Sequence, residues 1–199
     1  MSLRTLVALV ALALTCVLLA LSPSVAARDL PADSLYRFDA ALTDQDGTAL
    51  RFAGGQGEPR LVSMFYANCP FMCPLLIDTI RRSERELTAA ERTRLKILLV
   101  SFDARNDTPA ALRALADQRQ LDTPRWTLAR AEAADVRSIA ALLDIPFREL
   151  QDGHFSHAGV MVLLDGAGRA VARSDRMGKL DADFIAALRQ VLGAPTGTQ

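Results

Sequence analysis

Two cysteines stand close together in the chain, at a point where a predicted strand gives way to a predicted helix. Cys69 and Cys73 are separated by three residues, and each is followed by a proline. The apolar run at residues 61–66 predicts a buried strand before them. Pro74 predicts the first turn of a helix after them, because the missing N–H of proline costs nothing there. A thiol near a helix N-terminus is favoured as the thiolate, which is the form that attacks disulfides and binds metals.

The spacing alone does not decide how the pair is used. A structural disulfide usually staples a small, loop-rich domain, whereas this chain of 199 residues is half apolar and can build a sizeable core. Thiol–disulfide oxidoreductases of the thioredoxin type carry C-x-x-C. The extra residue between Cys69 and Cys73 opens the turn, which suits two thiolates that reach one ion. A metal site, a redox pair and a structural disulfide therefore remain as hypotheses.

The chain has two histidines, His154 and His157, both just before a predicted strand at residues 160–164. A histidine in a loop is usually only solvated, but His157 lies just before the start of the predicted strand, where the sheet fixes its position. In a thioredoxin-like sheet the hairpin at this point of the chain lies beside the cysteine turn. Two thiolates and one imidazole form a soft set that selects Cu(I) and tolerates Cu(II), whereas zinc prefers four ligands. We expect Met72 to pack rather than bind, and Asp103 to support a ligand or cap a helix.

The elements that must position these residues alternate between strands and helices. Thr108 and Pro109 are typical of the first positions of a helix, and residues 147–156 read as a polar surface loop. The order of elements predicts one α/β domain, a thioredoxin-like three-layer sandwich with a central mixed sheet. Strands are expected on both sides of the turn at 46–47 and at 61–66, 95–102, 125–128, 160–164 and 169–172, and helices at 75–87, 110–119, 133–143 and 181–192.

The N-terminal segment, residues 1–27, is typical of a targeting signal. Arg4 is followed by an apolar run at residues 6–21 and by small residues at 24–27. The run is shorter than the about 20 residues of a full membrane span, so the segment is predicted to be a signal peptide or, if uncleaved, a membrane anchor. Both predict export to a periplasm, which is oxidising, so the cysteine pair would need a reductant. Cys16 falls inside this segment.

The rest of the chain is predicted to contain a linker at residues 28–34, one domain at 35–193 and a flexible tail at 194–199. The sequence has 23 basic and 23 acidic residues and a formal net charge of zero. It contains no dense basic patch with interleaved aromatic residues, so we do not expect nucleic acid as a partner.

Three ordered motifs carry a resemblance to a known family. They read FYANCPFMCP at residues 65–74, SFDARNDTP at 101–109 and SHAGVMVLLD at 156–165. Over about residues 35–192 the chain resembles the Sco/SenC proteins (synthesis of cytochrome c oxidase). The resemblance implies a thioredoxin-like fold and a copper chaperone with Cys69, Cys73 and His157 as the copper ligands. It also implies a client, the dinuclear copper site of cytochrome c oxidase subunit II, supplied by metal delivery or by reduction of its cysteines.

The chain departs from the family pattern in two places near the proposed ligands. The family commonly has an acidic residue in the cysteine loop, where this chain has Phe71 and Met72, and an aspartate before the histidine, where this chain has Ser156. An apolar loop tip could contact a different client. Asp103 and Asp107 match acidic positions of the second motif, without an assigned ligand role.

A metallochaperone without enzymatic turnover is the leading hypothesis, and three alternatives remain. The cysteine pair could serve a thiol–disulfide oxidoreductase that acts on client cysteines or on peroxide. It could serve a redox or copper sensor that signals through a partner. It could also be the structural disulfide of an exported α/β domain.

Overall fold

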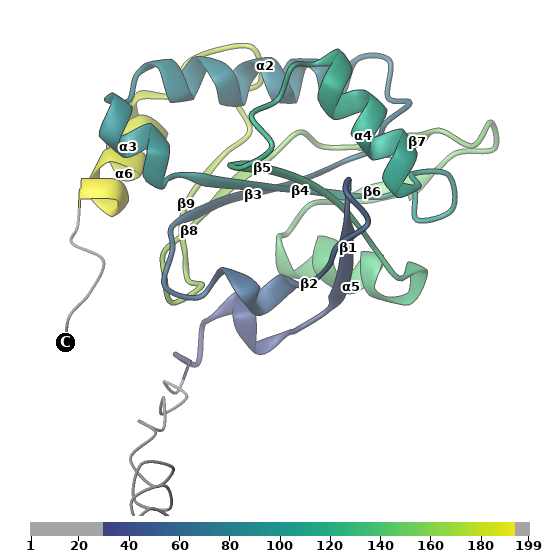
Figure 1. Ribbon diagram of the computed structural model, residues 1–199, viewed down its shortest axis with the longest axis horizontal. Coiled ribbons are helices and arrows are strands. Elements are labelled where there is room, and N and C mark those ends of the chain that lie inside the picture. The colour runs from purple at the N-terminus through teal and green to yellow at the C-terminus, as the bar shows by residue number, and fades with distance from the viewer. Residues whose placement is uncertain (1–29, 194–199) are drawn as a thin grey trace, which may run out of the picture.

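A mixed sheet of seven strands forms the middle layer of the protein in the computed structural model, which describes residues 30–193 (Figure 1). The strands are β1 (Ala41–Asp44), β2 (Ala49–Arg51), β3 (Arg60–Phe65), β4 (Lys96–Ser101), β5 (Trp126–Ala131), β8 (Met161–Leu164) and β9 (Ala170–Ser174). Their order across the sheet is β2-β1-β5-β4-β3-β8-β9. β6 (Phe147–Glu149) and β7 (Phe155–His157) pair in a separate two-stranded sheet.

The centre of the large sheet is parallel, and its edges are antiparallel. β4 pairs in parallel with β3 on one side and with β5 on the other. β8 and β1 flank this trio in antiparallel register. All residues of β3 and β4 after the first are buried, because strands covered on both faces need continuous apolar runs rather than alternation. The predicted buried strands at 61–66 and 95–102 are therefore confirmed.

Helices cover both faces of the sheet. The helices are α2 (Met72–Arg85), α3 (Ala89–Arg94), α4 (Pro109–Gln118), α5 (Ala133–Leu142) and α6 (Ala182–Gly193), and the 3₁₀ turns are η1 (Leu35–Arg37) and η2 (Phe52–Gly55). Figure 1 shows α2 and α4 on one face and α5 on the other. The predicted α/β class and three-layer arrangement are confirmed, with α2 and α4 serving as the crossovers that join the parallel strands.

Capping residues explain where two of the helices begin. Thr108 caps α4 through its side chain, with Pro109 at the first helical position, as the sequence predicts. Thr88 and Glu91 form a reciprocal capping box at the start of α3. The sequence predicted a helix at residues 75–87 and none at 89–94. The capping box starts a separate helix there, which is a correction.

The predicted surface loop at residues 147–156 is also wrong, because β6 and β7 occupy half of it. Phe147 pairs with His157 and Glu149 with Phe155 across this hairpin. The rings of Phe147 and Phe155 lie 4.7 Å and 6.1 Å from the ring of Phe102. Packing of these two phenylalanines holds the hairpin against the domain, and each strand is too short to show a clear alternating pattern in the sequence.

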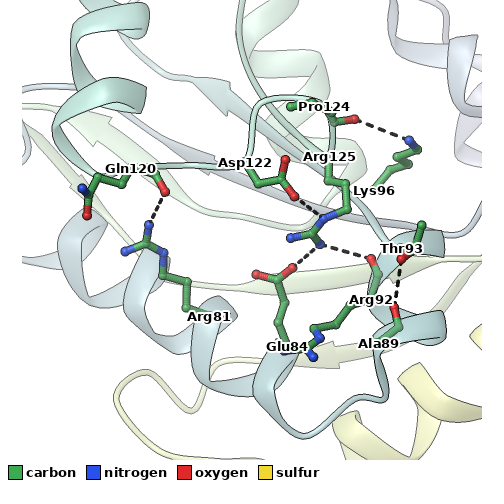
Figure 2. Close-up of polar contacts among 10 residues, drawn as sticks. All are labelled: Arg81, Glu84, Ala89, Arg92, Thr93, Lys96, Gln120, Asp122, Pro124 and Arg125. Atoms are coloured by element: carbon green, nitrogen blue, oxygen red, sulfur yellow. Dashed lines mark hydrogen bonds and ion pairs between the residues drawn. The ribbon is translucent and has the colours of Figure 1, made fainter.

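An ion-pair network far from the cysteine turn fixes α2 against β5. Figure 2 shows the guanidinium of Arg125 between the carboxylates of Glu84 and Asp122, at 2.5 and 2.6 Å. Arg125 also donates to the carbonyl of Arg92 at the end of α3. The Arg81 side chain donates to the carbonyl of Gln120 at 2.9 Å, beyond the end of α4. These contacts hold the second half of α2 in place.

Several predictions from the sequence concern residues outside the described range. The targeting segment at 1–27 and the tail at 194–199 lie there, as does Cys16. Within residues 30–193, no helix has the length and apolar character needed to cross a membrane. At the end of the predicted linker, the hydroxyl of Ser34 donates to the carbonyl of Ala167 at 2.6 Å.

The Glu84–Arg125 pair should contribute measurably to stability. We expect Glu84→Gln to lower the free energy of unfolding by about 1–3 kcal/mol, because it removes the buried one of the two carboxylates that pair with the largely buried guanidinium of Arg125. The matched control is Glu149→Gln, which removes the exposed ion pair with Arg105 and should change stability by no more than about 0.5 kcal/mol. Urea unfolding of both variants tests this, and equal losses would contradict the assigned role of burial.

Candidate metal centre

The two cysteines occupy the turn between β3 and α2. The N–H of Cys69 donates to the carbonyl of Tyr66 at 3.2 Å, which closes the turn after the strand. α2 begins at Met72, two residues before the predicted opening at Pro74, so Cys73 is the second residue of the helix. Phe71, at the N-cap position, supplies no side-chain acceptor. The Sγ of Cys69 takes that place, because it accepts the N–H of Cys73 at 3.2 Å.

Asp107, in the loop between β4 and α4, anchors the turn. Its carboxylate accepts the N–H of Ala67 at 2.9 Å and the hydroxyl of Ser101, at the end of β4, at 2.5 Å. Asp107 is buried, and burial is the main cause that raises the pKa of its carboxyl group. The turn that carries Cys69 is therefore tied to the same edge of the sheet as β4. The sequence analysis assigned no role to Asp107, although its place in the second motif was the available signal.

His157 ends β7 and faces both sulfurs. Its Nε2 lies 3.8 Å from the Sγ of Cys69 and 3.7 Å from the Sγ of Cys73. Its Nδ1 lies 3.2 Å from the carbonyl oxygen of Ala158. A carbonyl only accepts, so Nδ1 carries the proton in the neutral ring and the lone pair of Nε2 is directed to the cysteines. The structure therefore brings together the three residues that the sequence singled out.

Aromatic rings hold the imidazole in place. The ring of Phe102 lies 4.9 Å from that of His157, and the ring of Tyr66 lies 5.9 Å away in an edge-on arrangement. Both aromatic residues are buried, so the histidine stands against an apolar wall. The sequence analysis did not identify these two positions as part of the site. Tyr66 directly follows β3 and Phe102 directly follows β4, and parallel strands place such ends side by side.

The other candidates stand outside the donor group. Within residues 30–193, the only group of His, Cys, Asp and Glu side chains close enough to hold a metal is Cys69, Cys73 and His157, whose donor atoms all lie within 4.8 Å of one another. His154 is exposed and its Nδ1 lies 3.2 Å from the hydroxyl of Tyr66. Met72 packs partly buried against the core, and Asp103 binds the backbone and side chain of Asn106.

The two thiols differ sharply in acidity. The pKa of Cys69 is lowered to about 4, chiefly because its sulfur accepts a hydrogen bond from the thiol of Cys73, with further hydrogen bonds from the backbone of the turn. The pKa of Cys73 is raised, because its thiol donates that bond and because it is buried. At neutral pH the pair therefore holds one thiolate, on Cys69, and one proton. The site is prepared to attack a disulfide or to bind a metal with release of that proton.

The low pKa of Cys69 should appear in its reactivity. We expect alkylation of Cys69 by iodoacetamide to reach half its maximal rate near pH 4, whereas an ordinary thiol does so near pH 8.5. Cys73→Ala removes the thiol donor and should raise the pKa of Cys69. Rates measured by mass spectrometry across pH test this, and a rate that still climbs between pH 7 and 9 in the unmodified protein would contradict it.

Comparisons with solved structures find proteins of the same fold. ScoI from Bradyrhizobium japonicum with copper bound is 21% identical and has a TM-score of 0.65, and the match covers 77% of this chain and 98% of that chain. Yeast Sco1 with copper bound is 17% identical and has a TM-score of 0.65, with 79% of this chain and 88% of that chain covered. A SCO1/SenC family lipoprotein from Bacillus anthracis is 18% identical and has a TM-score of 0.71, with 82% of this chain and 98% of that chain covered. The predicted thioredoxin-like fold is therefore confirmed. A comparison with curated protein sequences found no significant match.

The family itself is settled by a match along the sequence. The profile of the SCO1/SenC family matches residues 31–193, which spans all but one of the residues that the structure describes. The resemblance seen in the three motifs is thus confirmed over the whole folded domain. The chain belongs to the SCO1/SenC family.

Proposed function

We propose that the protein is a copper-binding chaperone whose ligands are the Sγ atoms of Cys69 and Cys73 and the Nε2 of His157. The observation that carries this proposal is the convergence of these three atoms, all within 4.8 Å of one another. Two thiolates and an imidazole suit copper, Cu(I) above all. The three atoms come from two separate parts of the chain, so only the folded domain offers them together.

The donor spacing fits a three-coordinate metal. Bonds of about 2.0 Å to nitrogen and 2.3 Å to sulfur, at angles of about 120°, would place a nitrogen and a sulfur about 3.7 Å apart. The observed separations of His157 Nε2 from the two sulfurs are 3.8 and 3.7 Å. The bond from Nδ1 to the carbonyl of Ala158 would fix the ring orientation, as such outer contacts do in metal sites. The site suits zinc less well than copper, because zinc prefers four ligands and the described residues offer only these three donors.

The chaperone is proposed to act outside the cytoplasm on an oxidase. Export to a periplasm rests on the targeting pattern of residues 1–27, and residues 6–21 would anchor the protein in the membrane if the segment is not cleaved. The client is proposed to be subunit II of cytochrome c oxidase or another protein with a copper or thiol site. Support comes from a similar solved structure (18% identity, TM-score 0.68), described as a member of the Sco family of cytochrome c oxidase assembly proteins.

A second candidate function, thiol–disulfide exchange, is favoured by the unequal acidity of the two thiols. A thiolate on Cys69 beside a protonated Cys73 is the arrangement of an attacking and a resolving cysteine. Reduction of client cysteines and copper delivery could share this pair at different steps, because a disulfide between Cys69 and Cys73 would consume both thiolate ligands. A disulfide switch is described for the Sco protein named above, BsSco.

Copper binding should depend on each of the three donors. We expect Cu(II) added to the reduced protein to give an intense sulfur-to-copper charge-transfer band at one ion per chain. Cys69→Ser or Cys73→Ser should abolish the band, and His157→Ala should weaken copper binding by at least about tenfold. Titration by absorption spectroscopy, with competition by a chelator for the affinity, measures all of these.

His154→Ala is the matched control, because His154 lies three residues from His157 but outside the donor group. This variant should bind copper nearly as well as the unmodified protein. The same preparations should be tested for restoration of cytochrome c oxidase activity in a host that lacks the protein. Undiminished affinity in His157→Ala would remove the histidine from the ligand set and leave thiol–disulfide exchange as the better function.

Export can be tested on protein from the native host. N-terminal sequencing should begin near Ala27 or Arg28 if a signal peptidase removes residues 1–27. An intact Met1 in the membrane fraction would instead identify an anchor, with the domain still outside the cytoplasm. Recovery of the protein from the cytoplasm would refute export.

A further inference from the structure

The cysteine pair is bordered by two cavities on different sides. One, of about 270 Å³, contains Cys69, His157 and the exposed loop tip around Phe71. The other, of about 250 Å³, contains both Cys69 and Cys73 but no histidine. It lies between the cysteine turn, the first turns of α2 and the end of α4. Of these two cavities, only the second is lined by Cys73.

The second cavity carries a cation without a partner. Arg119 lines it, and the Nε of Arg119 is buried with no hydrogen-bond partner in the described part of the chain. No ion pair holds this guanidinium among residues 30–193, although Arg113 and Arg125 nearby in the sequence both have carboxylate partners. No aspartate or glutamate lines the cavity. A buried N–H group without a hydrogen-bond acceptor lowers the stability of the fold. A negatively charged ligand would supply the acceptor that the Nε of Arg119 lacks.

The lining residues also limit what that ligand can be. Asn68 and Gln118 supply neutral amides, and Pro70, Pro74 and Ile77 supply apolar walls. A cavity of about 250 Å³ lies below the range of about 300–1,000 Å³ that holds larger ligands. A compact molecule with one anionic group and one reactive sulfur matches this combination of a lone cation and two thiols.

We propose that this cavity is the entry site for a small anionic thiol that reduces the Cys69–Cys73 disulfide, with its carboxylate on Arg119. The proposal rests on the redox use of the pair suggested above. In the first step the thiolate sulfur of the ligand bonds to one protein sulfur, and the other protein sulfur leaves as a thiolate. A second thiol then attacks the ligand sulfur of this mixed disulfide, releasing the free disulfide of the ligand. Two ligand thiols are thereby oxidised to one disulfide. The two protein sulfurs gain the two electrons, and the two protons that the ligand thiols lose go to these sulfurs or to solvent.

This arrangement separates the two uses of the cysteines. A reductant that enters beside α4 reaches both sulfurs without passing His157, which lines the other cavity. The histidine side, with Phe71 at its rim, remains free for copper or a protein client. The recognition is electrostatic and partly buried, so a charge change at Arg119 should be felt strongly by an anionic thiol.

The test compares three small thiols on the full-length protein after its disulfide has been formed. Mercaptoacetate is anionic, mercaptoethanol is neutral and cysteamine is cationic. Reduction rates are normalised to thiolate concentration. We expect mercaptoacetate to lose about five- to tenfold in rate with Arg119→Gln, mercaptoethanol to change less than twofold, and Arg119→Lys to keep most of the preference for the anion. A rate for mercaptoacetate unaffected by Arg119→Gln would overturn the proposal.

Arg148→Gln is the control for general charge effects. Arg148 is exposed on β6 and pairs across the hairpin with Ser156, which lines the histidine-side cavity. This substitution removes the same charge on the other side and should leave the mercaptoacetate rate within twofold. An equal loss in Arg148→Gln and Arg119→Gln would show only a long-range field and would also overturn the proposal.

A second measurement on the reduced protein does not require the disulfide. The ratio of alkylation rates for iodoacetate, which is anionic, and iodoacetamide, which is neutral, should fall several-fold in Arg119→Gln and not in Arg148→Gln. An unchanged ratio would count against the anion site even if no disulfide can be prepared. Copper binding by the Arg119 variants is measured in parallel and should be retained. Failure of the unmodified protein to bind copper would refute the chaperone function, while the rate ratios still decide the anion site.

Discussion

The contact between the backbone N–H of Cys73 and the sulfur of Cys69 is the interaction on which the site depends. Helix α2 starts without an oxygen cap, and the sulfur of Cys69 supplies the missing acceptor at 3.2 Å. The positive end of the helix and this N–H stabilise negative charge on that sulfur. The thiol of Cys73 donates a further hydrogen bond to it. The start of the helix, the ionisation of Cys69 and the placement of the two sulfurs therefore depend on the same contact.

The large sheet gathers the residues that hold His157 beside the two cysteines. β3 and β4 are parallel and end together, so the cysteine turn, Phe102 and Asp107 gather at one edge. Asp107 fixes the backbone of the turn through Ala67. Phe102 and Tyr66 form the wall that receives His157 from the hairpin. Each of these supports is buried, so the donor geometry is set by the packing of the domain rather than by the loops alone.

Sequence reasoning reached the fold and the three side chains that converge in it because their signals are strong and local. Long apolar runs identify β3 and β4, and Thr108 with Pro109 marks the start of α4. The three motifs contain Cys69, Cys73 and His157. The β6–β7 hairpin was missed because its three-residue strands are held by tertiary contacts of Phe147 and Phe155 with Phe102, which no local pattern encodes. The unpaired Arg119 could not be foreseen, since a missing partner is visible only in three dimensions.

The hairpin that carries His157 is hydrogen-bonded as a two-stranded sheet of its own and is not a strand of the seven-stranded sheet. The two sulfurs belong to the core, while the imidazole belongs to this smaller unit. Displacing the hairpin would remove one donor without breaking any strand pairing of the large sheet, at the cost of local opening rather than global unfolding. If His157 ligates copper as proposed, the residence time of the ion is set independently of the lifetime of the folded state, and a very stable domain would still release it quickly.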